Sequence, residues 1–361
     1  MIFHTLLWML SSFVYNIYTQ LPPGYTCVPA GTCPPGQGMP GLDPRIVTGG
    51  NPCAPGQVPC LVQTTTTPTT TTSTTTTTRP TTPNPATFCG RRMVTNVTPF
   101  DGYASQGAWP WQAYLMNQTG FAGSGALITA NAVLTAAHKV YGNRQVLIPL
   151  FQYRILILVS RANPSLIGVY MGVYNPAQLG TRLSVATVTI HPQFNFVNYF
   201  HDIAILTLTN PIATLPQQLI NTICLPPPGT SFVGRTCSVS GWGQTNFNSN
   251  DAPIGQQKQV NVTIVSYATC YASMSNPLVL GQSANAFLDP VGEICAGGEP
   301  SRDSCTHDGG SPLVCFNNGT FVLAGLVIWG IGCGDSGVYG VYINVPNYLS
   351  WIQTALSNPS G

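Results

Sequence analysis

The sequence predicts an all-β fold of many short strands with a single helix at its C-terminal end. Glycine (37 residues) and proline (32 residues) are frequent, and both residue types disrupt helices and favour turns. Apolar or alternating segments of strand length recur, at residues 183–190, 203–208, 259–265 and 321–328. The helix is predicted by apolar side chains spaced i, i+3, i+4 and i+7 after Pro346, namely Tyr348, Trp351, Ile352 and Ala355.

Composition narrows the class of function. The chain has 361 residues, long enough for about two domains, and 44% of them are apolar, enough to build a core. Only 6% of the residues are charged, and the formal net charge is +2. We therefore expect no nucleic-acid partner, because phosphate binding needs clustered Lys and Arg side chains.

The N-terminal segment, residues 1–20, is predicted to be a secretory signal peptide because it carries an apolar run from Ile2 to Tyr15. A membrane anchor is the alternative. The run is shorter than the roughly 20 residues that a membrane-spanning helix needs. We therefore expect no membrane anchor once the signal peptide is removed.

Two further features favour a secreted, extracellular glycoprotein. The chain has 12 cysteines, an even number, and none lies in a C-x-x-C pair of the zinc type. Four asparagines fit the N-x-S/T rule for N-glycosylation: Asn96, Asn117, Asn261 and Asn318.

A small cysteine-rich module, residues 21–62, and a Thr/Pro-rich linker, residues 63–88, precede the main domain. The module contains Cys27, Cys33, Cys53 and Cys60, whose pairing stays open, and it is too short to fold without disulfides. Threonine dominates residues 64–82, where nothing can drive burial, so we expect an extended, disordered segment. This composition is typical of an O-glycosylated stalk, and a plain spacer is the alternative.

The most specific motif spans residues 303–315 and reads D-S-C-T-H-D-G-G-S-P-L-V-C. It resembles the nucleophile segment of the trypsin-like serine proteases, D-S-C-x-G-D-S-G-G-P-L-V-C. The nucleophile position holds Gly309, which has no hydroxyl for a base to activate. The resemblance covers residues 89–361 and implies a chymotrypsin-like double six-stranded β-barrel with a C-terminal helix, without a metal or a cofactor.

Two members of the catalytic triad have counterparts in the sequence. Residues 133–138 (V-L-T-A-A-H) resemble the general-base segment, and residues 202–206 (D-I-A-I-L) resemble the segment of the orienting aspartate. In an active member, His138 would deprotonate the serine and Asp202 would fix the tautomer of His138. Ser311 follows shortly after Gly309. We do not expect it to substitute, because a displacement of about 1 Å can already cost 10²-fold in rate.

The resemblance also assigns the oxyanion hole and the specificity pocket. His307 occupies the oxyanion-hole position, where the family has a glycine whose conformation a Cβ resists. The pocket that binds Arg or Lys in trypsin-like members matches Asp303, Trp329, Gly330 and Gly340. Two interpretations stay open: the pocket binds a basic side chain without cutting, or these residues persist because they pack the second barrel.

Activation of the family by cleavage has only a partial counterpart here. Active relatives are cut after an arginine, and the new N-terminus pairs with the aspartate found here as Asp308. Arg92 is the possible cleavage position, but the residues that follow (M-V-T-N) depart from the usual I-V-G-G. Arg45 begins a closer match, R-I-V-T-G-G, which lies within the N-terminal module.

The N-terminal module itself resembles a degenerate clip domain of arthropod protease homologues. The resemblance lies in C-V-P at residues 27–29 and D-P-R-I-V-T at residues 43–48.

The resemblance further implies a disulfide framework for the main domain: Cys89–Cys224, Cys237–Cys315, Cys270–Cys295 and Cys305–Cys333. The disulfide that normally flanks the histidine is absent, and Ala122 and Lys139 are assigned to its two positions. No orphan thiol results, since both partners are lost.

One segment does not fit the family. The stretch between His138 and Asp202 is considerably longer than the family leads us to expect, and the excess lies near residues 144–165. This insert is a partner-docking loop, an extra buried strand or a retained intron in the gene model, and we favour the last. A transcript without this stretch would exclude the loop.

The sequence favours a secreted, catalytically inactive protease homologue that acts as a cofactor or adaptor in an extracellular, innate-immune protease cascade. Its expected partners are extracellular proteins, either active clip proteases or their substrates. The alternatives are an active trypsin-like endopeptidase that cleaves after Arg or Lys, and a mucin-like extracellular structural protein.

Overall fold

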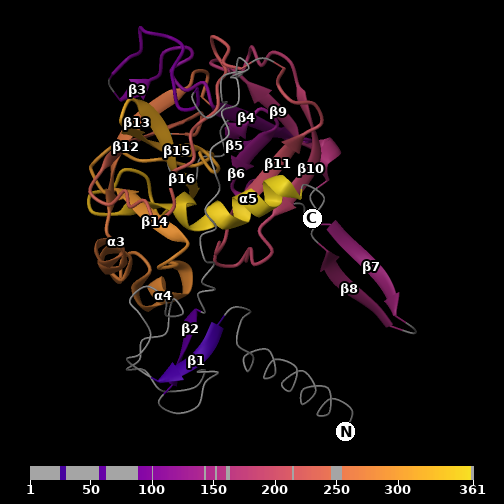
Figure 1. The fold of residues 1–361 in the computed structure, drawn as a ribbon, viewed down its shortest axis with the longest axis vertical. Coiled ribbons are helices and arrows are strands. Elements are labelled where there is room, and N and C mark those ends of the chain that lie inside the picture. The colour runs from indigo at the N-terminus through magenta and orange to yellow at the C-terminus, as the bar shows by residue number, and fades with distance from the viewer. Residues whose placement is uncertain are drawn as a thin grey trace, which may run out of the picture. The chain divides into compact units, whose positions relative to one another are not determined.

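The computed structural model describes residues 88–99, 101–141, 163–213, 215–244 and 254–358, and also four strands within residues 25–29, 57–61, 144–150 and 153–159 (Figure 1). The chain divides into two compact units, Met1–Pro80 and Thr81–Gly361. The predicted signal peptide, the Arg45 segment, Cys33, Cys53 and the linker up to residue 87 lie outside the described residues.

In the N-terminal unit the described residues form one two-stranded antiparallel sheet. Strand β1 (Tyr25–Pro29) pairs with β2 (Gln57–Leu61), so the two ends of the predicted cysteine-rich module lie side by side. The register places Cys27 opposite Pro59 and Cys60 opposite Thr26.

The second unit begins with a closed six-stranded antiparallel barrel. Its strands follow the order β10-β11-β6-β5-β4-β9 around the barrel. Their bounds are β4 (Gln112–Asn117), β5 (Gly120–Thr129), β6 (Ala132–Thr135), β9 (Gly168–Met171), β10 (Leu183–Ile190) and β11 (Ala204–Leu208). Leu115, Leu127, Val133 and Leu206 are fully buried inside it, as expected where alternate side chains of each strand point inward.

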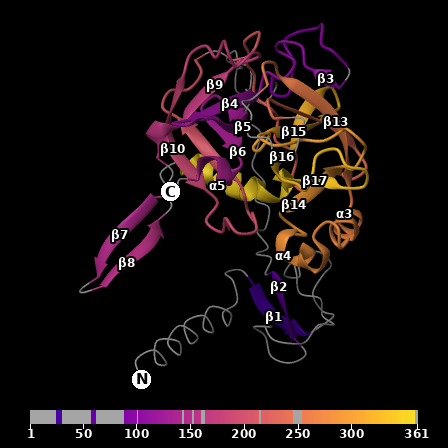
Figure 2. The same ribbon diagram turned by 180° about the vertical axis from the view of Figure 1, so that it is seen from behind.

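The second barrel is built from the C-terminal half of the chain (Figure 2). Its strands follow the order β12-β15-β16-β17-β14-β13, the pairing of β12 with β13 closes the ring, and β3 (Gly102–Tyr103) adds to β13. Their bounds are β12 (Thr236–Gly241), β13 (Lys258–Val265), β14 (Glu293–Gly297), β15 (Pro312–Asn317), β16 (Thr320–Trp329) and β17 (Tyr339–Asn344). The predicted all-β double barrel is therefore confirmed.

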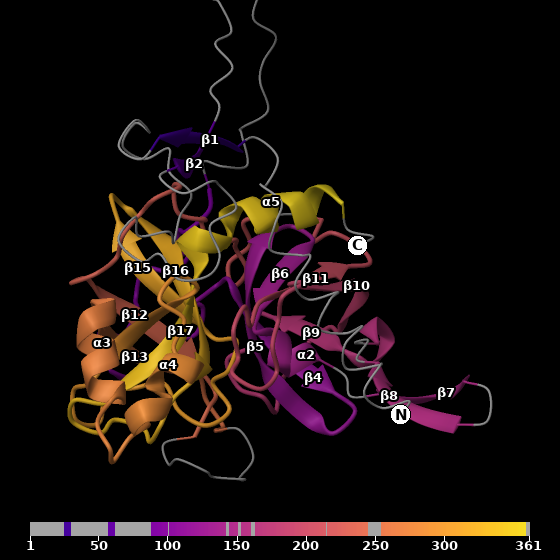
Figure 3. The ribbon, with the colours of Figure 1, turned by 90° about the horizontal axis from the view of Figure 1, so that it is seen from below.

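Among the residues that the structure describes, the helices are few and short. They are α2 (Ala137–Val140), α3 (Tyr267–Met274), α4 (Ala284–Phe287) and α5 (Leu349–Ser357), with 3-10 turns η3 (Pro164–Leu166), η4 (Gly281–Ser283) and η5 (Val345–Tyr348). The predicted C-terminal helix is α5, which buries Leu349, Ile352 and Ala355 and runs across both barrels (Figure 3). Tyr348 occupies the N-cap position of α5 without a side-chain capping hydrogen bond, and Pro346 lies in the preceding 3-10 turn, not in the α-helix. In the part of the chain that the structure describes, no helix is long and apolar enough to span a membrane.

The unexpected insert contains two strands, β7 (Arg144–Leu150) and β8 (Tyr153–Val159). They pair antiparallel with each other in a two-stranded sheet of their own, with Arg144 opposite Val159 and Leu150 opposite Tyr153. Both barrels are thus complete without the insert, which joins α2 to the segment before β9. A transcript that lacks residues 144–159 would therefore still encode every barrel strand.

Candidate active-site cleft

The structure brings His138 and Asp202 together in the geometry of a catalytic dyad. His138 lies on α2, directly after the buried strand β6, and Asp202 lies just before β11, which pairs with β6. The backbone N–H of His138 donates to Asp202 Oδ1 (2.8 Å), and Nδ1 of the imidazole lies 2.5 Å from Oδ2. Asp202 is fully buried, whereas His138 keeps 15% of its side chain exposed. Sheet pairing between β6 and β11 therefore brings together two side chains that are distant in the sequence.

Gly309, the predicted third triad position, lies beside the dyad, and the side chain of Lys139 fills the space that a side chain at position 309 would need. A Cβ placed on Gly309 would overlap Lys139 Cε, and it would lie 2.9 Å from Lys139 Nζ and 3.0 Å from His138 Nε2. The lysine amine is thus beside the imidazole, where an active member carries its nucleophile. Burial lowers the pKa of Lys139, while the nearby carboxylates of Asp202 and Asp308 act in the opposite direction.

The structure corrects the assignment of the lost disulfide beside the histidine. A Cβ on Gly123 would lie 3.0 Å from both Cγ and Cδ of Lys139, so Gly123, not Ala122, faces Lys139. The pleat of β5 explains the error, because a shift of one residue turns a side chain to the other face of the sheet. Because position 123 holds a glycine and not a cysteine, there is room for the aliphatic part of the Lys139 side chain.

Ser311 and Ser304, the two serines close to Gly309 in the sequence, are engaged in other contacts. Ser311 is fully buried, and its Oγ faces the interior, 3.4 Å from the Gln112 amide. The Ser304 hydroxyl bonds to the Tyr342 hydroxyl at 3.1 Å. These contacts fit the expectation that neither serine replaces the lost nucleophile.

His307, at the oxyanion-hole position, keeps the left-handed backbone that the family's glycine adopts, with φ of +75°. A non-glycine residue in this region is strained, because its Cβ approaches the backbone too closely. Its Nε2 is buried and has no hydrogen-bond partner among the described residues. The side chain lines the cleft, so the imidazole fills volume that a glycine would leave open.

The residues predicted to form the specificity pocket line one cavity of about 410 Å³. Its lining includes all four predicted pocket residues together with His138, Lys139, His307 and Gly309. Asp303 Oδ2 accepts the backbone N–H of Gly334 (3.1 Å), whereas Oδ1 is buried without a hydrogen-bond partner among the described residues. Burial raises the pKa of Asp303 to about 7. A Cβ on Gly340 would lie 2.9 Å from Asp303 Oδ1, so glycine at this position leaves room for the carboxylate.

The other three predicted pocket residues, Trp329, Gly330 and Gly340, also pack against residues of the second barrel. The indole N–H of Trp329 donates to Glu293 Oε1 (3.3 Å), and burial raises the pKa of Glu293 to about 8. Gly330 lies against Gly340, with the Cα of Gly340 3.7 Å from the position of a Cβ on Gly330. Trp329 and the two glycines therefore pack the second barrel as well as lining the cavity.

Asp308 is held by main-chain groups instead of a new N-terminus. Its two carboxylate oxygens accept the N–H groups of Gly243 (2.8 Å) and Cys305 (3.0 Å). Burial raises the pKa of Asp308 to about 6, and Lys258 and Lys139 counteract this increase.

Arg92, the possible cleavage position, is packed into the domain. Its guanidinium carbon lies 4.1 Å from the ring centre of Trp109 and 4.4 Å from that of Phe321, and Nε donates to the Ala108 carbonyl (2.7 Å). Burial lowers the pKa of Arg92 to about 10. A protease that cuts after Arg92 would have to withdraw this side chain from these contacts and bind it in its own specificity pocket.

We therefore expect the Arg92–Met93 bond to resist trypsin in the native protein. Limited proteolysis with N-terminal sequencing should find no cut there, while the denatured chain should be cut readily. Phe321→Ala removes one ring that covers the guanidinium and should accelerate the cut. Rapid cleavage of the native wild-type protein at this bond would contradict the expectation.

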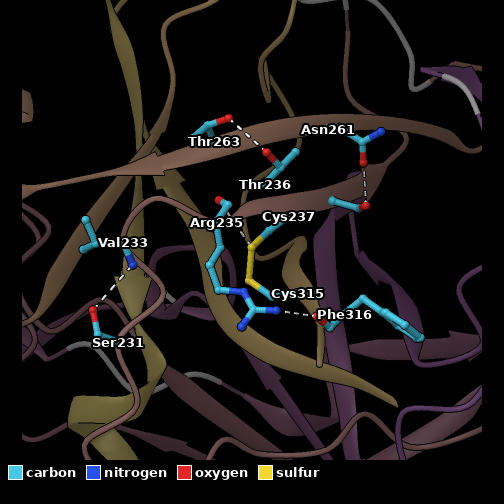
Figure 4. Close-up of a disulfide and its surroundings, with 10 residues drawn as sticks. Ser231, Val233, Arg235, Thr236, Cys237, Asn261, Thr263, Cys315 and Phe316 are labelled. Atoms are coloured by element: carbon cyan, nitrogen blue, oxygen red, sulfur yellow. Dashed lines mark hydrogen bonds between the residues drawn. A yellow bond between two sulfur atoms is a disulfide. The ribbon is translucent and has the colours of Figure 1, made fainter. Parts of the chain in front are cut away.

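The structure contains the four disulfides that the resemblance implies: Cys89–Cys224, Cys237–Cys315, Cys270–Cys295 and Cys305–Cys333. Figure 4 shows the bond between Cys237 and Cys315, which joins β12 to β15. Beside it, the guanidinium of Arg235 donates to the Phe316 carbonyl (2.7 Å).

The four predicted glycosylation sites are all accessible to some degree. Asn96, Asn117 and Asn318 are exposed, and Asn261 on β13 is half-buried. The amide oxygen of Asn261 accepts the Ser238 hydroxyl (2.7 Å) (Figure 4). Glycosylation at these asparagines remains a prediction.

Sequence reasoning missed several residues of the cleft. It assigns Lys139 only to the position of a lost cysteine, although a charged residue directly after the general-base histidine is a usable signal. The ring of Tyr199 lies 5.4 Å from that of His138 and lines the cavity. Outside the cavity lining, His191 stacks on His201 with ring centres 4.8 Å apart, and burial, with a smaller contribution from His201, lowers the pKa of His191 to about 4.

Comparison with known proteins decides the family, because residues 101–352 match the Trypsin family model. The chain belongs to the trypsin family. Inactive CLIP domain-containing serine protease A3 of Aedes aegypti is 36% identical, over 92% of this chain and 66% of the relative. Phenoloxidase-activating factor 2 of Galleria mellonella is 34% identical, over 70% of this chain and 82% of that protein. Inactive CLIP domain-containing serine protease A28 of Anopheles gambiae is 33% identical, over 68% of this chain and 60% of that protein.

These relatives place the chain among the non-catalytic, clip-type homologues of the trypsin family. The similarity to the Aedes protein reaches beyond the double barrel, because it covers 92% of the chain. The chain spans just under two thirds of that relative and of the Anopheles protein.

Proposed function

We propose that this trypsin-family homologue is a secreted pseudoprotease that binds a partner protein in an extracellular protease cascade. The observation that carries the proposal is a cleft with an intact His138–Asp202 dyad, in which Lys139 fills the space of the predicted nucleophile. One oxygen of Asp303 in this cleft has no hydrogen-bond partner among the described residues. Such a site retains the elements that bind a polypeptide and lacks the hydroxyl that would cut it.

The names of the relatives support this proposal. Two of them are named as inactive proteases and one as a phenoloxidase-activating factor. By analogy with these names, the chain would act as a cofactor or adaptor in an innate-immune cascade, with active clip proteases or their substrates as partners. Disulfides in the described part of the domain favour an oxidising, extracellular compartment.

The test is to treat the secreted protein with a fluorophosphonate probe, which labels an activated serine, and with benzamidine, which mimics a basic side chain. We expect no labelling and measurable benzamidine binding. Asp303→Asn should weaken benzamidine binding at least about tenfold, because it removes the negative charge in the pocket. Glu299→Gln is the matched control, since its carboxylate pairs with Arg302 (2.9 Å) and does not line the cavity. Labelling of the wild type would contradict the proposal.

Benzamidine binding should also depend on pH. The pKa of Asp303 is raised to about 7, and only the ionised carboxylate attracts a cation. The ionised fraction grows as the pH rises through this value, so the affinity should increase about tenfold from pH 6 to pH 8. Titration calorimetry at several pH values measures this. An affinity that stays constant over the range would contradict this prediction.

A further inference from the structure

Lys139 carries a positive charge into the centre of the cleft. Its amine lies beside His138 and takes the position that the nucleophile has in an active member. No carboxylate of the described residues lies within ion-pair distance of this ammonium. Asp202 pairs with His138, and Asp308 accepts two main-chain N–H groups. An anionic group that entered the cleft would therefore meet an ammonium that is free to pair with it.

The same cavity also carries a negative charge. Asp303 lines it, and the buried Oδ1 of this carboxylate has no hydrogen-bond partner among the described residues. The imidazole of His307 lines the cavity too, and its buried Nε2 likewise has no partner there. A ligand whose charges complement those of the cleft would thus place a basic group at Asp303 and an acidic group at Lys139.

A polypeptide that continues beyond its arginine or lysine supplies the basic group but no acidic group next to it. Where an arginine or lysine lies within a chain, its side chain can reach Asp303, but its carbonyl is a neutral amide. When the chain ends at that residue, the α-carboxylate adds a negative charge next to the basic side chain. Charge-assisted pairs are roughly twice as strong as neutral hydrogen bonds.

We propose that the cleft binds the C-terminal arginine or lysine of a polypeptide, with the basic side chain at Asp303 and the α-carboxylate at Lys139. Such ends are produced by proteolysis after Arg or Lys, so the protein recognises the product of a trypsin-like cleavage. The proposal rests on the proposed function, because it uses the same cleft and the same pocket carboxylate.

The test compares fluorescent peptides of one sequence that end in arginine, one as the free acid and the other as the C-terminal amide. A third peptide continues beyond the arginine. Fluorescence anisotropy with the wild-type protein should give affinity for the acid about ten- to a hundredfold above that for the amide and the extended peptide. Equal affinity for the acid and the amide, with benzamidine still bound, would overturn this inference and leave the proposed function standing.

Lys139→Met keeps an unbranched side chain of similar length and removes the charge. It should abolish the preference for the acid while leaving binding of the amide within about threefold, provided that thermal unfolding shows a folded protein. Lys258→Met is the matched control, because Lys258 also lies near Asp308 but does not line this cavity. Asp303→Asn should weaken acid and amide alike.

The remaining outcomes are distinguishable. If no peptide and no benzamidine bind, the proposed function fails together with the inference. If the acid is preferred but Lys139→Met retains the preference in a folded protein, Lys139 is not the carboxylate partner and the inference fails. The acid preference of the wild type should also fall with added salt, a measurement that needs no variant.

Discussion

Replacing Gly309 by serine will not restore proteolysis. The backbone at Gly309 is outside the left-handed region, so a side chain can be accommodated by the main chain. The obstacle is Lys139, because a Cβ at position 309 would overlap its Cε. Gly309→Ser alone should stay unlabelled by a fluorophosphonate, and its turnover should remain near the roughly 10⁶-fold loss that follows removal of a triad nucleophile. The overpacked side chain should also lower the free energy of unfolding by about 1–3 kcal/mol.

A series of variants separates the obstacles. Lys139→Ala combined with Gly309→Ser should recover the lost stability, because it removes the overlapping atoms. Labelling should then require His307→Gly as well, since an imidazole fills the oxyanion-hole position. Lys139→Ala without the serine is the control for each step and should remain unlabelled. Rapid labelling of the Gly309→Ser single variant would show that Lys139 moves aside readily.

Removing the Cys237–Cys315 disulfide should cause a large loss of stability. The two cysteines are 78 positions apart in the sequence, and their bond joins β12 to β15 inside the second barrel, where both are buried. Replacing both by alanine should cost about 2–5 kcal/mol, through greater freedom of the unfolded chain and through the small cavity that is left. A loss of this size should lower the melting temperature by roughly 10 °C in a domain of this length.

Thermal unfolding followed by circular dichroism measures this effect. The Cys270–Cys295 pair provides the comparison, because its sequence separation is only 25 and it should cost less in the same double-alanine variant. An equal loss in the two variants would mean that loop length does not govern the effect. An unchanged melting temperature of the Cys237→Ala/Cys315→Ala variant would contradict the prediction itself.

Several features of the fold could be predicted from short-range patterns. The strand at residues 183–190 has the predicted bounds, and the other three predicted strands shift by no more than one position at either end. Hydrophobic periodicity predicts such elements well, because it reports which face of each element is buried. Local sequence could not predict the surroundings of Arg92, the possible cleavage position. Its guanidinium stacks on Phe321, which belongs to the distant strand β16.

The sequence by itself predicted the all-β architecture, from composition and periodicity, and the family, from its motifs. Through the family resemblance it also predicted the four cysteine pairs of the main domain and a glycine, Gly309, at the position of the nucleophile. Only the tertiary structure decided what replaces the nucleophile. Lys139 contacts Gly123 and Gly309 because closure of the first barrel and its packing against the second bring β5, α2 and the segment before β15 to one point. No periodicity or spacing encodes a side-chain contact between residues 139 and 309, since it exists only once both barrels have formed.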